Sequence, residues 1–178
     1  MNYINLNIGE GVTLSTFPDG QPHAQIQSSI VNEFWSDNKF LSYVVCSLNN
    51  PTKLIQLLEV SNALDCFKSN GVIKHTLVIP YLMGARSDRL LHSGDSFDLQ
   101  VIANLINSCG FQRVQVFDPH SDVSIALIKN CQEISNKALL EEYALPESVL
   151  VCPDAGAAKK TENLLKWNKN RYWASLTK

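Results

Sequence analysis

Most of this chain alternates short apolar runs with longer segments of helical periodicity. Three apolar runs have the composition of buried strands: residues 41–48, 73–79 and 114–117. The segments between them have the pattern of helices, the first beginning at Asn50 and Pro51 and the second covering residues 96–109. Strand, helix and strand in this order predict a parallel sheet with right-handed crossovers and helices on both faces. We therefore expect an α/β fold whose functional side chains gather at the carboxyl ends of the strands.

Both of these helices carry apolar side chains at helical spacing. In the first they are Leu54, Leu57, Leu58 and Leu64, and Asn70-Gly71 supplies a left-handed stop. In the second they are Phe97, Val101, Ile102, Leu105 and Ile106, and Gly110 ends the helix. Each stripe predicts the face that packs on the sheet.

The two ends of the chain follow other patterns. The first 30 residues alternate apolar and polar side chains between glycines and prolines, which predicts short antiparallel strands. After the third strand we expect two short helices, and then a strand–helix–strand unit at 148–152, 157–167 and 172–176. The short helices are expected at 123–129 and 136–143. Pro146, within a possible hinge at 141–147, divides the chain into a domain of residues 1–146 and an incomplete second domain of residues 147–178.

Composition excludes several classes of protein. A net charge of -2 with scattered Lys and Arg gives no basic stripe for nucleic acid and no basic helix for a membrane surface. The five cysteines show no metal-binding spacing and mostly lie in apolar runs, as free thiols in a reducing compartment do. Neither a signal peptide nor a membrane span is evident. We expect a cytoplasmic protein.

Polar clusters follow three of the predicted strands. Arg86 and Arg89 lie in the segment after residue 79, and forked guanidinium donors suit a phosphate-bearing ligand such as a nucleotide. Asp118 and His120 follow residue 117, and Asp154 follows Cys152. An imidazole with two carboxylates could hold Mg²⁺, which keeps several waters and binds substrate phosphate. These residues are the candidates for a metal–phosphate site.

Each cluster also has a purely structural interpretation. Arg86 to Arg89 could form a solvated network of surface ion pairs, and the segment around His120 could be an ordinary turn. Asp154 precedes a predicted helix, and its whole role could be to cap the N-terminus of that helix. The chain lacks a Walker loop, a dinucleotide-binding glycine motif, a nucleophile elbow and zinc-ligand spacing. A P-loop kinase, a nicotinamide dehydrogenase and a serine hydrolase are thereby disfavoured.

Taken together, the ordered motifs resemble those of the ribose-phosphate pyrophosphokinase family. The family's Phe-x-Asp-Gly-Glu is similar to Phe17-Pro18-Asp19-Gly20-Gln21, and its Pro-Tyr and Ala-Arg-Gln-Asp-Arg are similar to Pro80-Tyr81 and Ala85-Arg86-Ser87-Asp88-Arg89. The family's Leu-Val-Ala-Asn-Leu-Leu is similar to Val101-Ile102-Ala103-Asn104-Leu105-Ile106. Its Asp-Leu-His resembles Asp118-Pro119-His120, and its Pro-Asp-Ala-Gly matches Pro153-Asp154-Ala155-Gly156. The resemblance covers nearly the whole chain. It implies a type I phosphoribosyltransferase-like fold.

The resemblance also implies an activity and a site. The family transfers the diphosphate of Mg-ATP to ribose 5-phosphate, and its members assemble as homo-oligomers, hexamers or other dimer-based assemblies. It implies that Asp19, Gly20 and Gln21 reach the ATP site of a neighbouring subunit, and that Arg86 and Ser87 contact ATP. It further implies that His120 and Asp154 bind Mg²⁺, and that Lys178 is the catalytic lysine.

Departures from the family pattern leave other functions open. The family continues beyond Lys178 into the loop that binds the sugar phosphate, so we expect these residues to be a fragment that is inactive by itself. Gln21, Ser87 and the segment 90–93 differ from the family's usual residues. These changes would suit another ribose 5-phosphoryl acceptor such as ADP-ribose. A non-catalytic regulatory homologue is a further alternative, and a phosphoribosyltransferase of the same fold is a weaker one.

Overall fold

The computed structural model describes residues 3–31, 41–66, 74–137, 142, 150–152, 157 and 173–175. The chain forms two compact units, Met1–Ile134 and Ser135–Lys178, and each is described by itself. The domain boundary predicted after residue 146 lies outside the described residues and stays a prediction.

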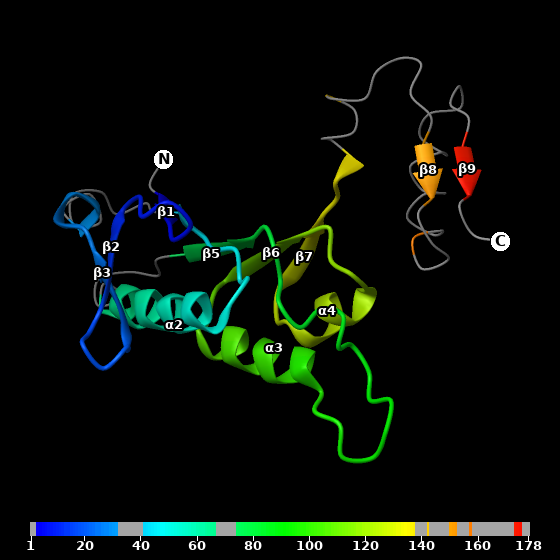
Figure 1. The fold of residues 1–178 in the computed structure, drawn as a ribbon. Helices are drawn as coiled ribbons and strands as arrows, with labels where there is room; N and C mark the ends of the chain where they lie inside the picture. The colour runs from blue at the N-terminus through cyan, green and yellow to red at the C-terminus, as the bar shows by residue number, and fades with distance from the viewer. Residues whose placement is uncertain are drawn as a thin grey trace. The chain divides into compact units, whose positions relative to one another are not determined.

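A parallel sheet forms the centre of the first unit (Figure 1). Its five strands lie in the order β1-β4-β5-β6-β7, and every neighbouring pair is parallel. They are β1 (Tyr3–Asn5), β4 (Leu41–Val45), β5 (Lys74–Ile79), β6 (Arg113–Phe117) and β7 (Cys131–Ile134). The predicted α/β fold with a parallel sheet is confirmed.

The N-terminal region is only partly antiparallel. β2 (Val12–Thr16) and β3 (Pro22–Ile26) form the expected antiparallel hairpin. β1 was expected to be antiparallel as well, and this was wrong, because it lies parallel to β4 at one edge of the main sheet. The reason is burial: Ile4 aligns with Val44 in a row of the sheet, and both are fully buried. Alternation predicts a strand but does not specify its partner.

Three described helices connect the strands of the main sheet. They are α2 (Pro51–Asp65), α3 (Asp98–Ser108) and α4 (Asp122–Leu127). The Asn50 side chain accepts a hydrogen bond from Lys53 N at 3.0 Å, and Pro51 occupies the first turn, so α2 begins where predicted. Figure 1 shows α2 and α3 on the same side of the sheet. The stop predicted at Asn70-Gly71 lies outside the described residues, and α2 ends at Asp65.

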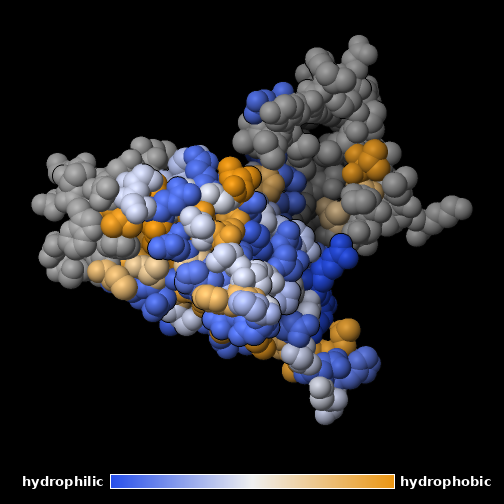
Figure 2. Space-filling view, turned by 60° about the vertical axis from the view of Figure 1, so that its left-hand side comes forward, coloured by the Kyte–Doolittle hydropathy of each residue, from blue (hydrophilic) through white to orange (hydrophobic). Residues whose placement is uncertain are grey.

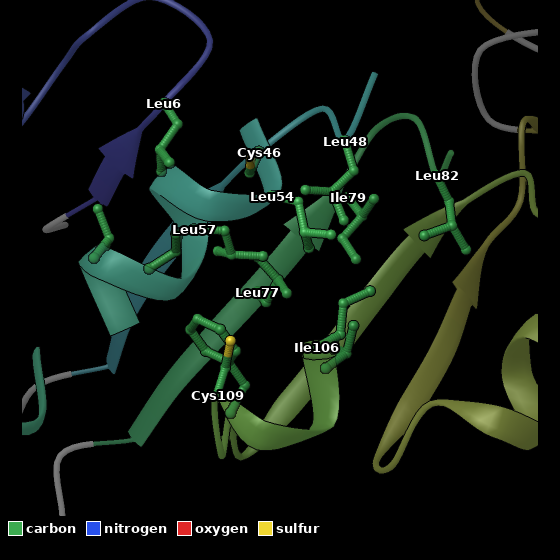
Figure 3. Close-up of a cluster of buried hydrophobic side chains, with 14 of the residues drawn as sticks. Leu6, Cys46, Leu48, Leu54, Leu57, Leu77, Ile79, Leu82, Ile106 and Cys109 are labelled. Atoms are coloured by element: carbon green, nitrogen blue, oxygen red, sulfur yellow. The ribbon is translucent and has the colours of Figure 1, made fainter. Parts of the chain in front are cut away.

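The hydrophobic core lies between this side of the sheet and the helices (Figure 3). Ile4, Val44, Leu77 and Val114 occupy one register row across four strands, and none is more than 2% exposed. Cys46 also lies in the core, where burial raises its pKa to about 12. The prediction that free cysteines pack as small hydrophobes is confirmed for Cys46 and Cys109, which are buried free thiols, and Cys152 is buried as well.

Two details of the helices and strands differ from the predictions. Val101 was placed on the buried stripe of α3, but its side chain is 53% exposed, whereas Leu99 and Ala103 are fully buried. β7 was not predicted, because its sequence Cys-Gln-Glu-Ile resembles a polar loop. In the structure none of its four residues is fully buried. It forms by pairing with β6 at the edge of the sheet.

The second unit contains one described pair of strands. β8 (Leu150–Cys152) and β9 (Trp173–Ser175) are parallel, as the predicted strand–helix–strand unit requires. The predicted helix at 157–167 falls almost entirely outside the described residues, as does most of the one at 136–143.

The described surface carries both polar and apolar side chains. Figure 2 shows one face of the molecule, on which apolar side chains form separate patches among hydrophilic ones. Large exposed apolar side chains include Ile8, Phe17, Tyr81, Leu90 and Leu91. No helix among the described residues is both long and apolar enough to cross a bilayer.

Candidate functional site

The loop after β5 carries Arg86 and Ser87 and is attached to α3. Gly84 adopts φ +73°, and a Cβ at this position would lie 2.6 Å from Ile102 Cδ1 in α3. Ser87 N donates to Gly84 O at 2.9 Å, and Leu99 N donates to Ser87 O at 3.4 Å. The glycine therefore allows the loop to approach the helix closely, with the Arg86 side chain left exposed.

The same loop is also bonded to the segment that follows β4. Leu48 N donates to Tyr81 O at 2.8 Å, and Met83 N donates to Leu48 O at 2.8 Å. The bonds extend the parallel pairing of β4 and β5 beyond the ends of the two strands. Backbone contacts on two sides thus fix the position from which Arg86 projects.

The loop after β6 carries His120. Asp118 has φ 41°, in the left-handed region, and its N–H donates to Ile134 O at 2.9 Å. Pro119 is buried, and Ser121 is the N-cap residue of α4 in extended conformation. His120 lies between these two anchored residues, and its side chain is exposed. Few non-glycine residues adopt this backbone region, and those that do are concentrated at functional sites.

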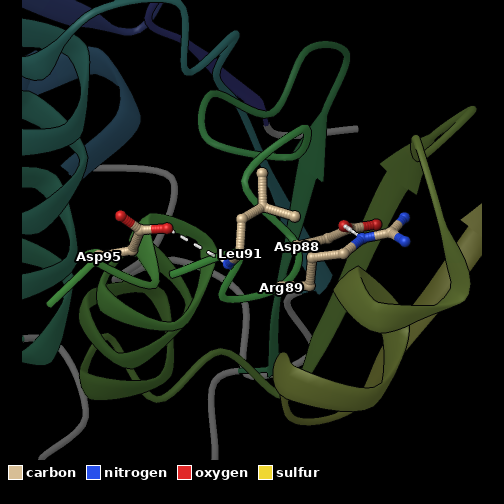
Figure 4. Close-up of polar contacts among 4 residues, drawn as sticks. All are labelled: Asp88, Arg89, Leu91 and Asp95. Atoms are coloured by element: carbon tan, nitrogen blue, oxygen red, sulfur yellow. Dashed lines mark hydrogen bonds and ion pairs between the residues drawn. The ribbon is translucent and has the colours of Figure 1, made fainter. Parts of the chain in front are cut away.

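Asp88 follows Ser87 directly in the loop after β5. It is only 7% exposed, and its Oδ1 accepts a hydrogen bond from Arg89 Nε at 3.1 Å (Figure 4). The Ser121 hydroxyl, followed by Arg89, lowers the pKa of this carboxyl, and the charge of His120 contributes in the same direction. Ser121 Oγ is buried and makes no hydrogen bond among the described residues.

The hairpin tip between β2 and β3 contains Asp19, Gly20 and Gln21. Asp19 Oδ1 accepts from Gln21 N at 3.0 Å, and Phe17 N donates to Gln21 O at 2.8 Å. All three residues are exposed. Figure 1 shows this tip and the loop after β5 on opposite sides of the first unit.

Comparison with known proteins identifies the family. Residues 1–110 match the model of the N-terminal domain of ribose phosphate pyrophosphokinase. The chain belongs to the ribose-phosphate pyrophosphokinase family. The family resemblance derived from the motifs is thus confirmed.

Individual members of the family align with nearly the whole chain. The chain is 28% identical over 174 residues to the ribose-phosphate pyrophosphokinase of Aquifex aeolicus, covering 91% of this chain and 51% of that protein. It is 30% identical over 172 residues to the one of Prochlorococcus marinus strain SARG, covering 94% and 50%. The chain therefore spans about half the length of the curated relatives it matches.

A solved structure has the same fold. The crystal structure of phosphoribosylpyrophosphate synthetase from Mycobacterium smegmatis superposes with a TM-score of 0.70 at 16% identity. The match covers 98% of this chain and 64% of that one. At this identity the likeness supports the fold, including the parallel sheet that positions the two loops.

Two of the residues that the pyrophosphokinase resemblance implicates cannot be placed. Asp154 and Lys178 lie outside the described residues, so their predicted roles in metal binding and catalysis stay predictions. The loop of Arg86 and Ser87 and the loop of His120 follow the neighbouring parallel strands β5 and β6, so both leave the same edge of the sheet. Asp88 was quoted in a sequence motif but given no role, and the missing signal was its burial, which residue type does not reveal.

The family resemblance implies Mg²⁺, and the described residues offer only some of the ligands that this ion would need. Among the described residues, no group of three or more His, Cys, Asp or Glu side chains could hold a metal. His120 and the half-buried Asp118 offer one imidazole and one carboxylate on the same loop. This set fits a Mg²⁺ ion that takes one or two protein carboxylates and completes its shell with phosphate and water.

Proposed function

We propose that this chain supplies the ATP-binding half of a ribose-phosphate pyrophosphokinase. The enzyme would convert ATP and ribose 5-phosphate to AMP and phosphoribosyl pyrophosphate. The single observation that supports this most is the family match over residues 1–110. The geometry agrees with it, because the two strand-end loops that bear the ATP and metal candidates follow the neighbouring parallel strands β5 and β6, at the same edge of the sheet.

In this proposal each candidate residue has one task. Arg86 presents forked donors to the phosphates of ATP, and the Ser87 hydroxyl donates beside it. Asp19, Gly20 and Gln21 contact the nucleotide bound by a neighbouring subunit of a homo-oligomer. His120 and Asp154 hold Mg²⁺, which when bound neutralises phosphate charge. Lys178 offsets the negative charge that develops as the phosphorus is attacked.

The reaction is a displacement at the β-phosphorus of ATP. The anomeric oxygen of the sugar forms a bond to this phosphorus, and the bond to the oxygen bridging the α- and β-phosphates breaks. AMP leaves with the bridging oxygen, and the hydroxyl proton is released to solvent. No covalent enzyme intermediate is required, so the protein contributes positioning and electrostatic stabilisation.

A second acceptor is favoured by specific sequence differences. Ser87 stands where the family has Gln, and residues 90–93 replace the usual basic segment. Both changes lie in the loop after β5. ADP-ribose, which also carries a ribose 5-phosphoryl group, is therefore the alternative acceptor. A non-catalytic regulatory homologue would use neither acceptor.

One assay separates these functions. The full-length protein encoded by the gene is incubated with Mg²⁺ and ATP plus either ribose 5-phosphate or ADP-ribose, and AMP is quantified. We expect AMP with ribose 5-phosphate, and we expect His120→Ala to lower the rate about a hundredfold by removing a group next to the phosphates. The matched control is His92→Ala, an exposed histidine of the loop after β5.

The outcomes have distinct meanings. AMP formation only with ADP-ribose would assign the alternative acceptor. An assembled oligomer that binds no Mg-ATP and forms no AMP would support the regulatory homologue instead. Equal rates for His120→Ala and His92→Ala would remove His120 from the site.

A further inference from the structure

The β2–β3 hairpin carries an aromatic contact next to its tip. The rings of Phe17 and His23 have centroids 5.2 Å apart and planes tilted by 47°. At this separation aromatic pairs attract one another beyond the effect of their buried area. His23 is half-buried and Phe17 is 48% exposed, so the contact lies at the protein surface.

This contact lies on the side of the hairpin that faces away from the core. Ala24 and Ile26 of β3 are buried, and β3 contacts α2. His23 alternates with these two residues along the strand and therefore points to the other side. It pairs with Ser15, and Phe17 follows two residues later on that same side. The core thus holds the body of the hairpin, whereas the tip extends past α2 (Figure 1).

Phe17 also closes the turn that forms the tip. The three tip residues are Asp19, Gly20 and Gln21. Phe17 N donates to Gln21 O at 2.8 Å, and Phe17 O accepts from Gly20 N at 2.9 Å. Asp19 Oδ1 accepts from Gln21 N at 3.0 Å within the turn. The conformation of the tip therefore depends on where Phe17 is held.

We propose that His23 is a positioning residue, whose ring packs against Phe17 and holds the three tip residues in the conformation that meets the nucleotide of a neighbouring subunit. The inference rests on the proposed function, which assigns the tip to that nucleotide. An exposed turn that is already ordered loses less conformational entropy on binding. His23 thereby strengthens nucleotide binding without touching the nucleotide.

Three substitutions separate the ring of His23 from its other properties. His23→Thr removes the ring but keeps a residue that suits a strand. His23→Tyr keeps a planar ring that can pack against Phe17. Gln25→Thr is the matched control, because Gln25 is exposed on the same side of β3 and pairs with Thr13, further from the tip.

The first measurement uses the full-length protein without ligands. Hydrogen–deuterium exchange is followed by mass spectrometry in peptides that contain residues 17–21. We expect His23→Thr to accelerate exchange in these peptides about fivefold, because loss of the aromatic pair shifts the turn toward its open form. His23→Tyr and Gln25→Thr should exchange like the wild type.

The second measurement is steady-state kinetics with Mg-ATP and ribose 5-phosphate. His23→Thr should raise KM for ATP about fivefold and leave kcat nearly unchanged, because the tip contacts the nucleotide alike in the substrate complex and in the transition state. His23→Tyr should restore the wild-type KM. A general loss of folded protein would lower the apparent kcat instead.

Each outcome decides a separate question. Unchanged exchange in folded His23→Thr overturns the positioning role, whatever the kinetics show. Equal behaviour of His23→Thr and His23→Tyr also overturns it, because the ring would then be dispensable. Faster exchange with an unchanged KM for ATP shows that the tip does not serve the nucleotide, and the inference fails.

Two further outcomes concern activity and folding. Faster exchange in a protein that never forms AMP supports the ordering of the tip by His23 and overturns the proposed function. If His23→Thr does not fold, Phe17→Leu replaces it in the exchange measurement, because it removes the other ring of the pair. Unchanged exchange in Phe17→Leu then overturns the inference.

Discussion

At the scale of single residues, backbone conformation shapes the strand-end loops. Gly84 and Asp118 both have positive φ angles, but for different reasons. Gly84 meets α3 at a distance that leaves no room for a side chain, whereas Asp118 is one of the short polar residues that tolerate the left-handed region. The sequence shows a glycine and an aspartate at these positions. It does not show that either must adopt a left-handed conformation.

Gly84→Ala tests the close approach of the loop to α3. We expect a loss of about 2 kcal/mol in the free energy of unfolding, because the new methyl group meets Ile102 Cδ1 and the positive φ becomes strained. Chemical denaturation measures the loss. Adding Ile102→Val removes the Cδ1 atom, so the double variant should lose less than the sum of the two single variants.

Gly94→Ala is the control for backbone strain alone. Gly94 has φ +93°, but no atom lies within 4 Å of its added Cβ. Its loss of stability should be smaller than that of Gly84→Ala. Equal losses, with no coupling between Gly84→Ala and Ile102→Val, would show that contact with the helix is unimportant.

At the scale of secondary structure, local signals located the helices better than the strand partners. Asn50 and Pro51 marked the start of α2 correctly, because a cap and a helix-starting proline act through neighbouring residues. The exposed Val101 shows that an apolar residue next to a buried stripe need not join it. β1 and β7 both lie at edges of the sheet and depend on pairing with strands elsewhere in the chain; alternation revealed β1 but not its partner, and β7 left little pattern to recognise.

Asn50→Ala tests the cap of α2. The change removes the acceptor for Lys53 N, and we expect a loss of about 1 kcal/mol in the free energy of unfolding. The control is Asn62→Ala in the same helix, at an exposed position, where alanine's higher helix propensity should leave stability equal or slightly raised. Equal effects of the two substitutions would contradict a capping role for Asn50.

At the scale of the whole molecule, the candidate site is divided. One loop pair carries Arg86, Ser87 and His120, and the hairpin tip with Asp19 lies on the other side of the same unit. The family resemblance implies that a neighbouring subunit supplies the tip. A homo-oligomer with such shared sites would explain why one chain does not assemble the full set of ATP contacts.

Mixed oligomers test this arrangement. Asp19→Ala and His120→Ala are each expected to inactivate the full-length enzyme, but their coexpression should restore about a quarter of wild-type activity, because one random site in four combines two intact parts. AMP formation measures the recovery. Coexpression of Arg86→Ala with His120→Ala is the control, and should restore nothing, since both residues belong to the same part of each site. Absence of recovery in the first mixture, with mixed oligomers present, would show that the tip serves its own subunit or none.

The amino-acid sequence by itself determined the α/β class, the starts of the helices and the family, because periodicity, caps and ordered motifs are local properties of the chain. Polar clusters at strand ends also indicated Arg86 and His120 as candidates, and the family resemblance added Ser87; their roles stay predictions. Only the tertiary structure decided that β1 joins the parallel sheet, that β7 exists, and that Asp88 is buried beside Arg89. These features depend on which distant segments come into contact and exclude water, and that selection is made by packing of the whole unit.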